Sequence, residues 1–275
     1  MNNEEFYEEV RAALVERFGC PVELTDVKKD NGVVKKGFCV GDGEVRPVLY
    51  INGLKSIEDT VDELAEVYAE QRRPVFNEDS VQVENIYLKV FSKELCKYDD
   101  CEQFPFLDLV FVPYLFLGNR EGEIAFARVT KAMENAYSLN LSGRFIELAE
   151  NTLRLFPTVV KSLTEVLSEW VKEPLGHEDL PMFVITNESC VNGAASALLG
   201  DSLKQLADRV GGDLIVIPSS LHEILCVPMN DIEIGEVNQM VEEINQSCIA
   251  PEEVLSGHTY YYSLEEGKLK NGVQS

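Results

Sequence analysis

Four side chains that could take part in catalysis lie in one short stretch near the C-terminal end of this 275-residue chain. They follow an apolar run that ends in proline, and they are Ser219, Ser220, His222 and Glu223. A serine, a histidine and a carboxylate are the ingredients of nucleophilic catalysis, in which the histidine accepts the serine proton. We take this stretch as the candidate site, together with Asn187 and Asn192 on the loop after an earlier predicted strand.

A structural role explains the same residues without any chemistry. Strand residues alternate between two faces, so Ser220 and His222 would share one face of a strand and Glu223 would lie on the other. The chain also has no Gly-x-Ser-x-Gly elbow. We expect His222 to form a hydrogen bond at the edge of the strand, with ligand or partner binding as the second interpretation and catalysis as the third.

Sequence motifs for metals and cofactors are missing. Cys96 and Cys101 form the one close cysteine pair, but a zinc site needs about four ligands at short paired spacings. The chain has no Walker loop and no Gly-x-Gly-x-x-Gly motif. The two glycines at 211–212 suit the end of a helix rather than a phosphate-binding loop. His177 falls in a predicted linker, and His258 opens a tyrosine-rich strand where an edge position is the ordinary explanation. We therefore predict neither a metal nor a cofactor, and we lean away from enzymatic activity.

Hydrophobic periodicity predicts the elements that must hold these side chains. The predicted N-terminal elements are a helix over 3–18, strands over 21–28, 32–40 and 45–51, and a helix that Ser56 begins. The other predicted strands are 81–90, 107–117, 123–129, 182–186, 213–217, 223–227 and 258–263. The other predicted helices are 129–137, 142–153, 158–171, 201–210 and 234–246, and residues 194–199 form a short strand or a helical turn.

The run Asp213–Pro218 has an echo upstream, at Asp108–Pro113. Each copy has an acidic residue, four apolar residues and a proline, which is typical of a short buried strand that stops at the proline. Duplication of a strand–strand–helix unit and a chance match of apolar residues both explain the echo. We predict an α+β fold with mixed or antiparallel sheets and helices packed on one face. The expected regions are 1–78, 79–172 and 173–275, with 79–275 as one paired domain in the alternative.

The formal net charge of −24 argues against conventional nucleic-acid binding, because backbone phosphates would be repelled. Acidic helix surfaces explain this charge most simply, and mimicry of a nucleic acid is the alternative. No apolar run reaches the ~20 residues that cross a bilayer, and the N-terminus lacks the features of a signal peptide. Seven cysteines are an odd number, which favours free thiols in a reducing compartment. We expect a cytoplasmic protein that binds neither nucleic acid nor membranes.

Several motifs resemble those of an uncharacterised bacterial family that is known only as a domain of unknown function. The resemblance covers roughly residues 80–275, and the first 75 residues match more loosely. Its motifs are Phe183–Asn187, Asn192–Ala195, Ile217–Glu223 and Glu252–Ser256, with further likeness at Leu107–Leu109 and Ala149–Thr152. A more remotely similar family has Pro-His-x-Asp where this chain has Pro-Ser-Ser, which indicates a retained polar turn rather than a fixed catalytic set. The resemblance implies no known activity, cofactor or catalytic residue.

These observations favour a non-catalytic module that binds a protein or a small molecule. The first alternative is a hydrolase that uses the turn from Ser219 to Glu223. The second is an acidic inhibitor or defence modulator that imitates nucleic acid. The arrangement of the candidate residues in space separates these functions, because convergence in a pocket favours ligand binding or catalysis, whereas burial argues against catalysis.

Overall fold

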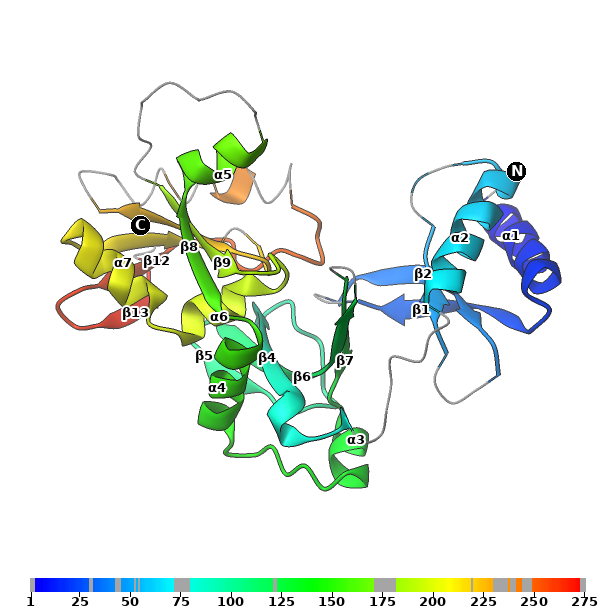
Figure 1. Ribbon diagram of the computed structural model, residues 1–275, viewed down its shortest axis with the longest axis horizontal. Coiled ribbons are helices and arrows are strands. Elements are labelled where there is room, and N and C mark those ends of the chain that lie inside the picture. Colours follow the sequence, from blue (N-terminus) through cyan, green and yellow to red (C-terminus); the bar gives the residue numbers. More distant parts are fainter. Residues whose placement is uncertain are drawn as a thin grey trace. The chain divides into compact units, whose positions relative to one another are not determined.

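The chain forms two compact units, Met1–Phe76 and Asn77–Ser275, and the second unit contains the predicted central and C-terminal regions. The computed structural model describes residues 3–29, 32–42, 46–51, 53, 55–71, 80–120, 123–170, 182–218, 220–229, 237, 241–243 and 249–272. Both units combine helices with antiparallel sheets, so the predicted α+β fold is confirmed (Figure 1). No helix in this described part of the chain is long and apolar enough to cross a membrane.

The first unit packs two helices on one face of a three-stranded antiparallel sheet. Its elements, in chain order, are α1 (Asn3–Phe18), β1 (Val22–Lys28), β2 (Val34–Val40), β3 (Val48–Leu49) and α2 (Ile57–Gln71). Leu14 of α1, Phe38 of β2 and Leu64 of α2 are almost completely buried in one shared core. Ser56 begins α2 as predicted, because its Oγ accepts the Asp59 N–H at 3.1 Å. Local spacing and capping thus account for this unit.

The second unit contains a four-stranded sheet built around a long strand, β6. The strands are β4 (Ile86–Ser92), β5 (Phe104–Phe106), β6 (Leu109–Arg120) and β7 (Glu123–Arg128), and the 3-10 helix η3 (Val83–Asn85) precedes them. Strand β6 pairs with β4 along one edge, and with β5 and then β7 along the other. The sequence does not predict β5, which is only three residues long.

Pro113 does not end β6, contrary to the expectation from the sequence, since the strand continues to Arg120. The Pro113 carbonyl accepts the Val129 N–H at 3.0 Å, so the proline nitrogen points to the same edge of β6. On that edge β5 pairs as far as Phe111, and β7 begins to pair at Tyr114. The missing N–H therefore falls between two partner strands, where no ladder hydrogen bond is required.

Two helices follow this sheet, and the second covers the outer edge of β4. These helices are α3 (Lys131–Ala136) and α4 (Phe145–Leu155). Thr152 Oγ1 of α4 accepts the Leu88 N–H at 2.9 Å, and Asn151 Nδ2 donates to the Ile86 carbonyl at 3.1 Å. Two helical side chains thus satisfy backbone groups that would otherwise need another strand.

The sequence predicts one helix over 158–171, and this prediction is wrong. The structure has a strand, β8 (Thr158–Ser162), followed by a helix, α5 (Leu163–Trp170). Threonine and valine at 158–160 are β-branched and favour a strand, and β8 pairs with β9 along its whole length. Ser162 then begins α5, because its Oγ accepts the Glu165 N–H at 3.1 Å while Glu165 Oε2 accepts the Ser162 N–H at 2.6 Å.

A six-stranded antiparallel sheet forms the rest of the second unit, in the order β13-β12-β10-β11-β9-β8. Its other elements are β9 (Phe183–Asn187), α6 (Gly193–Leu199), α7 (Ser202–Val210), β10 (Leu214–Ile217), β11 (Ile224–Pro228), β12 (Tyr260–Ser263) and β13 (Lys268–Asn271). Strand β10 is buried and pairs on both sides, as predicted. The sequence does not predict β13. Of the predicted helix at 234–246, only 237 and 241–243 lie within the described residues, and they are helical.

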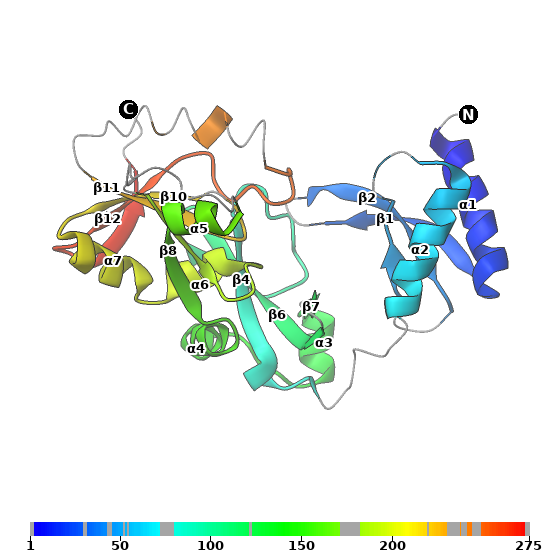
Figure 2. The same ribbon diagram turned by 45° about the horizontal axis from the view of Figure 1, so that its top comes forward.

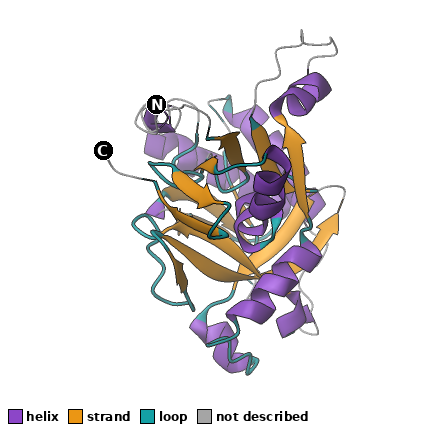
Figure 3. Ribbon diagram, turned by 90° about the vertical axis from the view of Figure 1, so that its left-hand side faces the viewer, coloured by secondary structure: helices purple, strands orange, loops and turns teal. Residues whose placement is uncertain are grey.

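Helix α6 lies where the two sheets of the second unit meet, and it contacts both β9 and β4 as well as α4 (Figure 2). Ser196 of α6 is completely buried, and its Oγ donates to the Phe156 carbonyl at 2.9 Å. The Ser196 carbonyl accepts the Thr158 hydroxyl at 3.2 Å. A side view shows the strands of this unit with helices packed along them (Figure 3). The helix therefore connects the β4 side of the unit to the β8–β9 side.

The acidic residues that begin the two echoed runs both bind side chains of β12. Asp108 Oδ1 accepts the Tyr260 hydroxyl at 2.9 Å, although Asp108 belongs to the turn before β6. Asp213 accepts a hydrogen bond from the hydroxyl of Tyr261, the residue after Tyr260, and Asp213 Oδ1 also accepts the Leu264 N–H at 2.8 Å. Neighbouring strand residues point to opposite faces, so the two carboxylates hold β12 from both sides.

We expect Asp213→Asn to destabilise the fold in a way that depends on pH. Hydrogen bonds from Tyr261 and from the Leu264 N–H hold the pKa of the Asp213 carboxyl below its usual value. A carboxyl whose pKa is lowered on folding stabilises the protein above its unfolded pKa, and this contribution disappears as pH falls through the folded pKa. The difference in unfolding free energy between wild type and variant should therefore be constant above about pH 5 and shrink below about pH 4.

Urea unfolding at a series of pH values measures this difference. The matched control is Asp201→Asn, at the exposed position before α7, where the side chain makes no capping hydrogen bond. A difference between wild type and Asp213→Asn that persists unchanged down to about pH 3 would contradict the assignment of the stabilising role to the ionised carboxyl.

Candidate functional site

The candidate residues on the described part of the chain come together where the loop after β9 meets the turn between β10 and β11. Ser219 lies outside the described residues. Strand β11 begins only at Ile224, so residues 220–223 form a turn and do not alternate between the faces of a strand as the sequence suggests. Side chains that the strand pattern would separate can therefore lie close to each other in this turn.

Ser220 stabilises the turn and does not face the histidine ring. The residue is only 3% exposed, and its Oγ donates to Glu223 Oε1 at 3.3 Å and accepts the His222 N–H at 3.0 Å. The Ser220 N–H donates to the Glu223 carbonyl at 3.3 Å. A nucleophilic serine needs its hydroxyl against a basic nitrogen and open to substrate, and Ser220 has neither arrangement.

The His222 ring joins three segments of the chain. Its Nδ1 accepts the Asn192 N–H at 3.2 Å, and its Nε2 lies 3.4 Å from Glu253 Oε1. This pattern assigns the ring proton to Nε2, because Nδ1 acts as an acceptor. The Leu221 N–H also donates to the Glu253 carbonyl at 2.9 Å. Both ring nitrogens are thus used within the protein, in keeping with the structural interpretation of His222.

Asn187 shapes the loop that approaches this turn. It is 1% exposed, its Oδ1 accepts the Ser189 hydroxyl at 2.8 Å, and its Nδ2 donates to the Val191 carbonyl at 2.8 Å. Asn192, with a φ of 55°, then adopts the left-handed conformation that asparagine tolerates better than most residues.

Gly193 allows the loop and the turn to approach each other closely. A Cβ atom at this position would lie 2.5 Å from the His222 carbonyl oxygen and 2.7 Å from the Asn187 nitrogen, and would also meet the Thr186 hydroxyl. Two of these three neighbours are backbone atoms, which cannot rotate away. The site therefore requires glycine because of space rather than because of its φ angle.

A second polar group, which the sequence does not predict as a site, links β12 to the turn before β6. His258 Nε2 lies 2.9 Å from Asp108 Oδ2, and His258 Nδ1 lies 2.9 Å from the Thr259 carbonyl oxygen. Burial and the charge of Asp108 raise the pKa of the Tyr260 hydroxyl, so the hydroxyl remains a donor to Asp108. His258 is thus a bridging residue, whereas its sequence position suggests an ordinary edge residue.

A cleft of about 540 Å³ opens beside Asp108 and His258. Its other lining residues are one lysine, one glutamate, two serines and one glycine. They are Lys93, Glu94, Ser92, Ser256 and Gly257. Sequence reasoning misses this cleft, because its walls come from β4, from the turn before β6 and from the loop before β12. The available signals were weak: Asp108 begins an echoed run, and Ser256 ends one of the family-like motifs.

The described residues include no group of three or more histidine, cysteine, aspartate or glutamate side chains that could hold a metal ion. Six of the seven cysteines fall in that part of the chain, all as free thiols, whereas Cys248 lies outside it. Burial raises the pKa of the Cys226 and Cys101 thiols, which keeps both protonated and unreactive.

We expect Gly193→Ala to destabilise the protein strongly. The added methyl group would press on backbone atoms of His222 and Asn187, and overpacking of this kind costs about 1–3 kcal/mol or more. Gly212→Ala is the matched control, because a Cβ there meets no atom within 4 Å and the change should be nearly neutral or slightly stabilising. Thermal and urea unfolding of both variants measure the effect, and equal stabilities would refute the close approach.

His222→Ala should lower the free energy of unfolding by about 1–3 kcal/mol, because the Asn192 N–H would lose its acceptor in a half-buried position. Glu188→Ala, at an exposed position on the same loop, should change it by less than about 0.5 kcal/mol. If urea unfolding of His222→Ala matched that of wild type, the ring would be free to serve a ligand instead.

Comparisons with known proteins identify the family but no activity. Neither the curated proteins nor the solved structures give a significant match to this chain. One family model, described as a family of unknown function (DUF5688), matches residues 3–264 and so covers both units. The chain therefore belongs to the DUF5688 family of unknown function, in keeping with the resemblance found in its motifs.

Proposed function

We propose that this protein is a non-catalytic binding module, and that the cleft beside Asp108 and His258 holds a small ligand that carries both an ammonium and a carboxylate group. A free amino acid or a short peptide has this chemistry. The observation that carries the proposal is the presence of opposite charges, from Lys93 and Glu94, on the rim of one cleft with two serine hydroxyl groups.

The hydrogen bonds of His258 support binding rather than proton transfer. Both ring nitrogens face acceptors inside the protein, Asp108 Oδ2 and the Thr259 carbonyl oxygen. A general base needs a free nitrogen within hydrogen-bond reach of the substrate. The Tyr260 hydroxyl is likewise engaged, as a donor to Asp108. Asp108 and His258 thus form a wall of the cleft that internal hydrogen bonds hold in place, and recognition is left to the groups around it.

The rim groups have the chemistry to recognise a zwitterion. The Lys93 ammonium can pair with a carboxylate, and the Glu94 carboxylate can pair with an ammonium. The Ser92 oxygen accepts the Leu95 N–H at 3.4 Å, so its O–H can donate to a ligand carboxylate, whereas the Ser256 hydroxyl is already bonded to the backbone of His258. The Lys93 N–H donates to the Asp108 carbonyl at 2.9 Å, which fixes the lysine backbone beside the cleft. The volume of about 540 Å³ lies within the range of ~300–1,000 Å³ that is typical of ligand pockets.

The hydrolase alternative would use a serine, or a water activated by His222, in the turn from Ser219 to Glu223. Ser220 is buried and directs its hydroxyl to Glu223, so it offers no support for that reaction. The alternative of a nucleic-acid mimic depends on the charge of −24, and no arrangement of the cleft residues favours it.

A thermal-shift and calorimetric panel tests the proposal. The ligands are free amino acids and dipeptides, together with N-acetyl amino acids, which lack the ammonium group, and amino-acid amides, which lack the carboxylate. We expect only ligands with both groups to stabilise the protein, by about 2.7 kcal/mol when the ligand concentration is 100 times Kd.

Lys93→Ala should weaken binding of the preferred ligand at least tenfold, because the carboxylate loses its cationic partner. Lys131→Ala, at an exposed lysine of α3 in the same unit, should leave the affinity unchanged. Equal affinity of the wild type and Lys93→Ala for that ligand, or no binding by any member of the panel, would overturn the proposal.

A further inference from the structure

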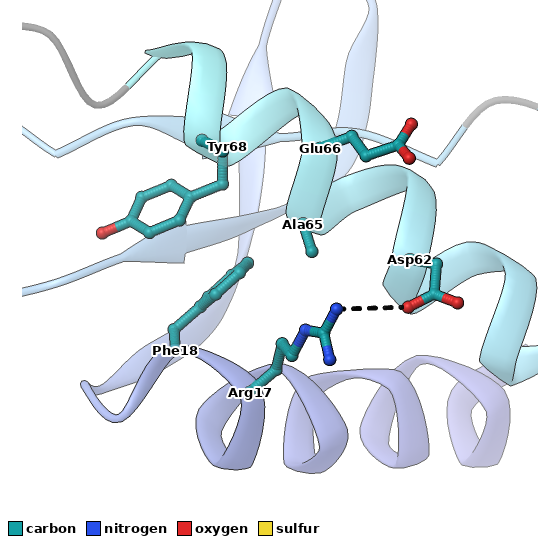
Figure 4. A pocket seen from close by; sticks show the side chains of 7 residues that line it. Arg17, Phe18, Asp62, Ala65, Glu66 and Tyr68 are labelled. Carbon is teal, nitrogen blue, oxygen red and sulfur yellow. Dashed lines mark ion pairs between the residues drawn. The ribbon is translucent and has the colours of Figure 1, made fainter.

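A groove runs between α1 and α2 of the first unit, near the C-terminal end of α1 (Figure 4). Its volume is about 530 Å³, and it is lined by Arg17, Phe18, Asp62, Ala65, Glu66, Tyr68 and Ala69. The groove belongs to one compact unit, so its shape depends only on how the two helices pack on their own sheet.

One part of the groove is apolar, with aromatic rings at its end and small residues along one side. The rings of Phe18 and Tyr68 lie with their centroids 4.3 Å apart, which forms an aromatic end wall. Ala65 and Ala69 of α2 add no bulk between the helices, and Ala69 is exposed. A partner's aliphatic or aromatic side chain could therefore contact Phe18, Ala65, Tyr68 and Ala69 at once.

The other end of the groove is charged and easily opened. Arg17 Nη2 lies 3.6 Å from Asp62 Oδ1, and the two side chains are 60% and 63% exposed, so this ion pair contributes little to stability. Glu66 of α2 also lines the groove and adds a second carboxylate near Asp62 (Figure 4). A cation from a partner can compete with Arg17 for Asp62 at small cost.

The two helices carry a large excess of negative charge. The sequences of α1 and α2 together contain eleven carboxylates and only two arginines, Arg11 and Arg17. Both arginines are already paired, Arg11 with Glu8 at 2.8 Å and Arg17 with Asp62. The two helices that form the groove thus carry net negative charge, and such charge attracts cationic partners and speeds their association.

We propose that this groove is a docking site for a short basic segment of another protein. The segment inserts one aliphatic or aromatic side chain against Phe18, Ala65 and Tyr68, and its lysine or arginine side chains pair with Asp62 and Glu66. Aromatic and arginine side chains are the ones that protein interfaces favour. This site lies in the other unit from the cleft at Asp108, and neither proposal depends on the other.

Fluorescence anisotropy with the full chain and labelled 12-residue peptides tests the proposal. One peptide carries four lysines or arginines and a central leucine or tryptophan, and the second has alanine at the central position. We expect the first peptide to bind at least tenfold more tightly than the second, because only it fills the groove. Both affinities should fall as salt rises.

Two variants that change charge equally locate the binding. Ala69→Arg fills the groove and should weaken binding of the apolar-centred peptide at least tenfold. Ala12→Arg places the same charge at an exposed position of α1 outside the groove lining, and should weaken it less than threefold. Circular dichroism checks that both variants fold. If Ala69→Arg does not fold, Ala69→Gln, which blocks the groove without a new charge, should still reduce the preference for the apolar-centred peptide at least threefold.

Equal weakening by Ala69→Arg and Ala12→Arg would mean that the peptide is held by net charge alone, and the docking site would be refuted. Equal binding of the two peptides to the wild type, or no binding by either peptide at low salt, would refute it as well. None of these results affects the cleft at Asp108, because zwitterionic ligands are tested separately with Lys93→Ala.

Discussion

The second unit depends on the close approach between the start of helix α6 and the turn before β11. At Gly193 the backbone of one segment lies so near the backbone of the other that no side chain fits. This approach lets the Ala194 N–H reach the Leu221 carbonyl at 3.2 Å and the Asn192 N–H reach the His222 ring. Since α6 also contacts β4, the same point of contact fixes the four-stranded sheet relative to the six-stranded one. Several polar side chains that resemble catalytic residues serve this purpose.

The sequence predicts those elements that local spacing defines. The four-residue apolar period of α1 and the apolar run of β10 are sufficient, because burial follows directly from each pattern. The wrong predictions occur where a distant partner decides. Val159 continues the helical spacing of the apolar residues in α5, which suggests one long helix, but β9 offers residues 158–162 a full set of strand pairs. Strand β5 forms by pairing with the first residues of β6. Pro113 is tolerated within β6 because β5 and β7 meet beside it, so that its missing N–H breaks no pairing.

The candidate site shows the same division between local and distant information. Ser220, His222 and Glu223 are neighbours in sequence, so their gathering in one turn follows from the chain itself. The contact of His222 with Asn192 spans 30 residues, and that of His258 with Asp108 spans 150. No local pattern encodes such pairs. The echoed aspartates came nearest to doing so, since both bind tyrosines of the same strand, although the echo gave no hint of which strand that would be.

The edges of the sheets determine whether their apolar strands can pair with strands of another molecule. The buried strand Leu214–Ile217 and the tyrosine-rich β12 have the composition of segments that stack into amyloid-like sheets. Strand β13 covers β12 and places Lys268 and Lys270 on the outermost strand, where charge discourages pairing with another molecule. On the other sheet, Asn151 and Thr152 occupy the edge of β4 only once α4 has formed. Detachment of α4 or β13 would therefore uncover the edge of β4 or of β12 for pairing with another molecule, even while both sheet interiors remain intact.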